Sequence, residues 1–113
     1  MALASGRLRH KVELQEQAQT QDPESGEILV TWQTIARPWA AIEPLSARDF
    51  IAAQAQQSEV RGRITIRRRA DINASMRILH RGLIYRILGV LNDPESGLEY
   101  QTLPVSEGVK LEH

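Results

Sequence analysis

Cysteine is absent from the 113-residue sequence, which excludes disulfide bonds, thiol nucleophiles and zinc sites built on thiolates. Aromatic residues are scarce, with two Trp, two Tyr and one Phe, so the core has to be built mainly from Ile, Leu and Val. No apolar run approaches the roughly 20 residues of a membrane-spanning helix, and the first ten residues lack the apolar stretch of a signal peptide. We therefore expect a protein that is made in the cytoplasm and has no membrane partner.

Motifs for catalysis and cofactor binding are also missing. His10 and His80 do not stand at a metal-ligand spacing, and the glycines form no phosphate-binding loop. The neighbouring carboxylates Glu24 and Glu27 fall in an expected surface turn, where nothing would tune their pKa values for acid–base catalysis. We expect no enzyme activity, no cofactor and no metal site.

Charge is unevenly distributed, although the net charge is zero. Residues 61–86 hold eight Arg and a single acid, Asp71, which gives this segment a net charge of +7 and the rest of the chain −7. Such polarity can guide association between unlike faces of neighbouring subunits, or present a basic surface to DNA. The alternative for any one of these Arg is an ordinary solvent-facing position on a strand.

Alternation of apolar and polar residues runs through most of the chain and is typical of half-buried strands. Leu8, Val12 and Leu14 share one face of the first strand. The turn sequence DPESG occurs at residues 22–26 and again at 93–97, and the first copy predicts a long hairpin. The inward positions of the strands predict the core residues Trp32, Ile64, Ile66, Ile78 and Ile87.

The alternation stops at residues 46–58. Ser46, with Asp49 three residues later, is a weak capping box that favours a short helix. The only large apolar side chains in this stretch are Phe50 and Ile51, and one adjacent pair cannot anchor 13 residues against their conformational entropy. We expect a mobile loop, with a helical turn or two, that is dispensable for folding. Packing of the apolar pair on the sheet is the alternative.

These patterns predict a mainly β fold, a small antiparallel β-barrel of about seven strands with one long loop containing a short helix. A barrel is favoured because so short a chain must hide its sheet edges. Residues 1–110 are expected to form a single domain, and residues 111–113 (LEH) are expected to be the remnant of a tag.

Four segments, in this order, resemble the phage head–tail joining family, whose members are called head-closure or stopper proteins and head–tail adaptors. The first is residues 6–12 (GRLRHKV), and the second combines residues 31–32 (TW) with 39–49 (WAAIEPLSARD). The third combines residues 57–60 (QSEV) with 63–67 (RITIR), and the fourth residues 76–78 (MRI), 85–87 (YRI) and 106–108 (SEG). The resemblance spans nearly the whole chain.

The resemblance implies a non-enzymatic structural protein of a bacteriophage or prophage virion, assembled in the bacterial cytoplasm. It implies a ring oligomer below the portal that retains packaged DNA and docks the tail. The expected partners are further copies of the chain, the portal or adaptor protein, the tail terminator protein and, without sequence specificity, the double-stranded DNA in the channel. The isolated protein is expected to be a monomer.

Two groups of residues form the candidate site. The resemblance places residues 46–58 at the DNA channel or against a neighbouring subunit, with the candidates Ser46, Arg48, Asp49, Phe50 and Ile51. The basic candidates, facing DNA or a subunit interface, are Arg61, Arg63, Arg67, Arg68 and Arg69. The alternative function is a small β-barrel that binds nucleic acid nonspecifically through the same basic residues. The lack of aromatics between residues 50 and 85 argues against base-specific binding.

Overall fold

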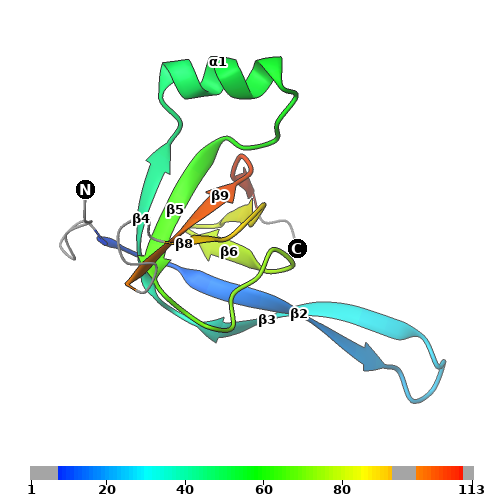
Figure 1. Ribbon diagram of the computed structural model, residues 1–113. Coiled ribbons are helices and arrows are strands. Elements are labelled where there is room, and N and C mark those ends of the chain that lie inside the picture. The colour runs from blue at the N-terminus through cyan, green and yellow to red at the C-terminus, as the bar shows by residue number, and fades with distance from the viewer. Residues whose placement is uncertain (1–7, 93–98, 111–113) are drawn as a thin grey trace.

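The alternating segments form short antiparallel strands, and the stretch between two of them forms a helix (Figure 1). The computed structural model describes residues 8–92 and 99–110. In chain order the elements are β1 His10–Lys11, β2 Glu13–Gln21, β3 Ile28–Ala36, β4 Trp39–Pro44, α1 Ala47–Ala55, β5 Gly62–Arg67, β6 Arg77–His80, β7 Leu83–Arg86, β8 Leu91–Asn92, β9 Tyr100–Val105 and β10 Val109–Lys110.

The described strands form two antiparallel sheets, ordered β1-β4-β5-β9-β8 and β10-β7-β6-β2-β3. The mainly β prediction is confirmed, whereas the prediction of about seven strands is wrong, because there are ten among the described residues. The long alternating segments break where the chain passes from one sheet to the other. Pro38 has no N–H for the ladder and lies between β3 and β4, and its carbonyl accepts the N–H of Val12, which lies between β1 and β2, at 3.0 Å.

The two sheets meet a second time at the end of β9. Ile87 and Val105 form an isolated antiparallel bridge between them. On either side of that bridge, the N–H of Leu88 donates to the carbonyl of Pro104 at 2.8 Å, and the N–H of Ser106 donates to the carbonyl of Arg86 at 3.1 Å. Backbone hydrogen bonds therefore link the sheets at this second place as well.

The core lies between the two sheets and is aliphatic, as the composition requires. Its buried residues are Val12, Leu14, Ala40, Ile64, Ile66, Met76, Ile78, Ile87, Leu103 and Val105. The four isoleucines predicted for the core are confirmed, but the prediction for Trp32 is wrong, because its side chain is only partly buried. Alternation identifies which residues share a face of a strand, but it does not tell whether a second sheet covers that face. Strand β3 extends beyond the other sheet, so part of this face has no covering layer (Figure 1).

The first DPESG segment forms the predicted turn of the β2–β3 hairpin. Asp22 donates its N–H to the carbonyl of Glu27 and accepts the N–H of Gly26, both at 2.8 Å, and Gly26 has a φ of 73°, which glycine adopts without strain. The second DPESG segment lies outside the described residues. A tighter turn joins β6 to β7, where Arg81 and Gly82 both have positive φ, as a two-residue hairpin loop requires.

Helix α1 occupies the stretch where alternation stops, and its predicted cap is confirmed. The hydroxyl of Ser46 accepts the N–H of Asp49 at 3.2 Å, and the helix continues for nine residues. None of these nine residues is buried. The helix therefore contributes little to the core.

The first prediction concerns Ile64, which is fully buried on the central strand β5. We expect Ile64→Ala to lower the free energy of unfolding by about 2–5 kcal/mol, because it removes buried methyl groups and leaves a cavity. Urea denaturation followed by circular dichroism measures the change. Ile51→Ala on the exposed face of α1 is the matched control and should change stability by less than about 0.5 kcal/mol. Wild-type stability of the Ile64→Ala variant would contradict the assignment of the core.

Candidate assembly surfaces

The β2–β3 hairpin extends away from the two sheets (Figure 1), and its tip exposes apolar side chains. Ile28, Leu29 and Val30 are 63%, 43% and 50% exposed. Consecutive strand residues point to opposite faces, so the tip is apolar on both faces of a two-stranded ribbon. Gathered exposed apolar side chains are typical of a surface that contacts another molecule.

Helix α1 is a second projection, at the opposite end of the molecule from the hairpin tip (Figure 1). Its apolar pair is exposed, with Phe50 at 38% and Ile51 at 66%. One ion pair tethers the helix to β5, between Asp49 Oδ2 and Arg63 Nη2 at 3.0 Å, with both side chains about half exposed. Such a pair contributes at most about 1 kcal/mol. The helix is therefore held at its ends by the chain and only weakly by its side chains.

A groove of about 450 Å³ lies below α1 and combines apolar and charged walls. Phe50 lines it from the helix, Arg61 and Arg63 from the start of β5, and Tyr85 from β7. The guanidinium of Arg61 lies 5.4 Å from the centre of the Phe50 ring, within the range of a cation–π contact. Gly108 closes one side, and a Cβ there would stand 3.0 Å from the Tyr85 ring. A side chain at residue 108 would therefore force the Tyr85 ring to shift by a few tenths of an ångström.

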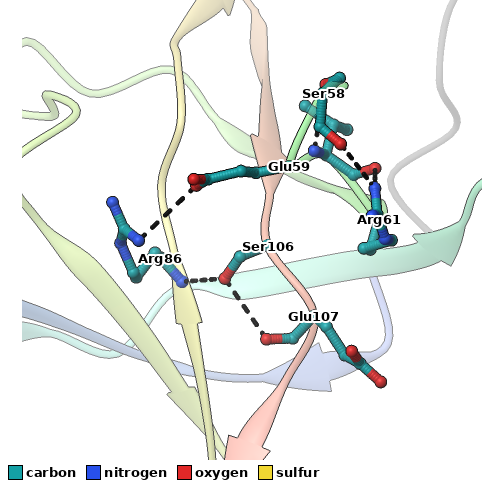
Figure 2. A network of polar contacts seen from close by, with 7 residues as sticks. Ser58, Glu59, Arg61, Arg86, Ser106 and Glu107 are labelled. Atoms are coloured by element: carbon teal, nitrogen blue, oxygen red, sulfur yellow. Dashed lines mark hydrogen bonds and ion pairs between the residues drawn. The ribbon is translucent and has the colours of Figure 1, made fainter. Parts of the chain in front are cut away.

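A network of polar contacts lies next to this groove, at the place where the two sheets meet (Figure 2). Arg61 Nη1 donates to the carbonyls of Ser58 and Val60 at 2.8 and 2.9 Å, which fixes the segment between α1 and β5. The N–H of Arg86 donates to the hydroxyl of Ser106 at 3.1 Å. The side chain of Arg86 lies 3.7 Å from Glu59, and both groups are largely exposed. The network joins the segment that follows α1 to the place where the two sheets meet.

The predicted basic residues do not form one patch, because they stand at opposite ends of β5. Arg61 and Arg63 lie under α1, whereas Arg67, Arg68 and Arg69 lie where the strand ends. Several already have local partners. Arg69 binds both carboxylate oxygens of Asp71 at 3.0 Å, and Arg67 lies 5.7 Å from the centre of the Tyr100 ring. The +7 of this segment is therefore divided between the two ends of the strand, and two acids from outside the segment, Asp49 and Glu59, pair with Arg63 and Arg86.

A second groove, which we call the hairpin groove, involves none of the residues that the sequence predicted for the candidate site. It has a volume of about 570 Å³, and its lining includes Trp32, Met76, Arg77, Ile84 and Arg86. Arg77 Nε donates to Gln15 Oε1 at 2.7 Å, and its guanidinium lies 4.3 Å from the Trp32 ring centre. Burial lowers the pKa of Arg77, although a guanidinium stays charged in proteins. Only the pairing of β2 with β6 brings Gln15 opposite Arg77, and no sequence pattern reports that register.

His10 and His80 lie edge to face, with ring centres 5.2 Å apart. Burial lowers the pKa of His80, and the charges of His10 and Arg81 lower it further. Both histidines are partly buried. Among the described residues, no three or more His, Cys, Asp or Glu side chains gather in a way that could hold a metal ion.

The second prediction follows from the lowered pKa of His80. The unfolded chain takes up this proton near pH 6.5, while the folded protein takes it up only at lower pH, so stability rises with pH across that interval. We therefore expect a lower melting temperature at pH 5.0 than at pH 7.5, and a smaller loss for His80→Asn. Differential scanning calorimetry at both pH values measures the effect. An equal loss in the wild type and the variant would contradict the assignment to His80.

Two sheets around a small aliphatic core, with two projections whose apolar side chains face outward, are features of a protein that assembles with others. Residues 3–108 match the family of phage head completion proteins, and the chain belongs to this family. It is thus a structural protein of a phage head. No curated protein matches the sequence. Helix α1, the single helix among the described residues, lacks the length and apolar run needed to cross a bilayer.

Two solved structures share the fold. The chain is 32% identical to a protein from Shigella flexneri 2a whose solution structure is known, with a TM-score of 0.72, and the match covers 93% of this chain and 97% of that one. It is 18% identical to a chain in the virion of a native gene transfer agent particle, with a TM-score of 0.60, and this match covers 91% and 96% of the two chains.

Proposed function

We propose that this chain is a head–tail connector subunit that forms a ring below the portal, retains packaged DNA in the head and docks the tail. The observation that carries the proposal is the pair of projections, α1 and the β2–β3 hairpin, whose apolar side chains are exposed. A folded monomer gains nothing from exposing them, whereas a ring subunit needs surfaces for its neighbours. The portal or adaptor protein and the tail terminator protein are the proposed partners at the two faces of the ring.

We further propose that the two sheets close into one small barrel, as a rigid ring subunit would require. Three linkages support closure. The first two strands follow each other through Val12, β3 and β4 follow each other through Pro38, and the Ile87–Val105 bridge joins the far sides of the sheets. A closed sheet removes edges that would otherwise pair with other chains.

In this proposal α1 faces the DNA channel or the neighbouring subunit, with Ser46, Arg48, Asp49, Phe50 and Ile51 as its contact residues. DNA in the channel would be contacted through phosphates, because the exposed arginines at the two ends of β5 offer charge without an array of stacking aromatics. The protein would act in the virion after assembly in the bacterial cytoplasm. A purified monomer that bound DNA tightly in a salt-dependent manner would favour the alternative of a nucleic-acid-binding module.

The third prediction tests the role of α1 by replacing residues 47–57 with a short Gly/Ser linker. Because no residue of the helix is buried, we expect the melting temperature to stay within about 5 °C of the wild type. We also expect the variant to fail to complement the parent phage deleted for this gene, with heads that lose their DNA. Scanning calorimetry and plaque counts are the two measurements.

The control for this experiment keeps the helix and changes only its apolar pair, in the double variant Phe50→Ala and Ile51→Ala. If contact through these side chains is what matters, the double variant also folds and also fails to complement. A large loss of melting temperature in the linker variant would place α1 in the core. Normal folding together with full complementation would show that α1 has no assembly role.

A further inference from the structure

The tip of the β2–β3 hairpin is both apolar and acidic. Ile28, Leu29 and Val30 expose apolar surface on both faces of the ribbon. Residues 12–36, which include the whole hairpin, contain five acids and no Lys or Arg. A partner for this tip must therefore cover two apolar faces and carry positive charge. A groove meets the first condition better than a flat surface.

The hairpin groove meets both conditions. Its apolar lining includes Trp32, Met76, Ile84 and Val109, and its charged lining consists of Arg77 and Arg86, with no carboxylate among its lining residues. Arg77 keeps its charge while it donates to the neutral amide of Gln15. Arg86 has only a long and largely exposed contact with Glu59, at 3.7 Å, so its charge remains available to a partner.

We propose that the hairpin tip of one copy inserts into the hairpin groove of the next copy. The tip does not fill the groove of its own chain, because the groove is lined by Gln17 and Trp32, midway along the hairpin, and the hairpin extends on from there away from the sheets (Figure 1). Because the tip and the groove are different surfaces of the subunit, their contact is head-to-tail. Repeated from copy to copy, such a contact closes a ring when the rotation between neighbouring subunits is a whole fraction of a turn. The inference rests on the proposed ring and identifies the surfaces that join its subunits.

Site-directed cross-linking can test this contact cleanly, because the chain contains no cysteine of its own. Leu29→Cys places a thiol at the tip, and Ala74→Cys places one at the groove. The two variants are expressed together in cells that carry the parent phage deleted for the gene, and purified particles are treated with a short bis-maleimide. The matched control replaces Ala74→Cys by Asn92→Cys, at an exposed position of β8 in the other sheet.

We expect a cross-linked dimer from the tip and groove variants together, and none from the tip variant with the β8 control. The tip variant alone should also give no dimer, whereas a symmetric tip-to-tip contact would produce one. Particles that contain the chain but yield no tip-to-groove dimer overturn the inference and leave the proposed function intact. Particles in which even the wild-type chain is absent overturn the proposed function itself.

A second measurement keeps the test independent of cysteine chemistry. Val30→Asp adds charge to the apolar tip, and Asn92→Asp adds the same charge at an exposed position of β8, in the other sheet. We expect Val30→Asp to be lost from particles and Asn92→Asp to be retained, with both purified proteins melting like the wild type. Equal incorporation of the two variants would contradict insertion of the tip.

Discussion

The pairing of β5 with β4 on one side and β9 on the other is the interaction on which the rest of the structure depends. It places Ile64 and Ile66 at the centre of the aliphatic core. The same strand carries Arg61 and Arg63 under α1 at one end and the Arg67–Arg69 run at the other. Because the composition offers few aromatics, this central strand and its neighbours have to bury nearly all the apolar surface available. Helix α1 and the hairpin tip are left without a buried core of their own, and their apolar side chains stay exposed.

How far the sequence predicts the structure depends on the range of the interaction. The alternation at residues 8–14, the turn at Gly26, the Ser46 cap and the inward isoleucines are local features, and each is found as expected. The position of Trp32 and the break at Val12 depend on which sheet lies over which strand, and no local pattern predicts that. The site follows the same rule. The exposure of Phe50 and Ile51 was predictable from their isolation, whereas the stack of Arg77 on Trp32 required the pairing of β2 with β6.

The fold separates charged residues that are neighbours in the sequence and places them at opposite ends of a strand. The sequence count suggests one strongly basic region, but the fold separates its arginines and gives several of them partners such as Asp49 and Asp71. What remains is an acidic hairpin at one extremity and a groove with two arginines near its base. Ion pairs at exposed sites add little stability, so this arrangement bears more on which surfaces meet than on whether the chain folds.

The register of β5 with β9 has a consequence for synthesis of the chain. Gly62 pairs with Val105 and Arg67 with Tyr100, so the central strand receives its second neighbour from a segment that is synthesised well after it. The hairpin can form as soon as its own residues leave the ribosome, because its contacts are local, but Ile64 and Ile66 stay uncovered on one side until residues 100–105 have been synthesised. Each new chain therefore passes through a stage in which the hairpin can form while the core is still incomplete.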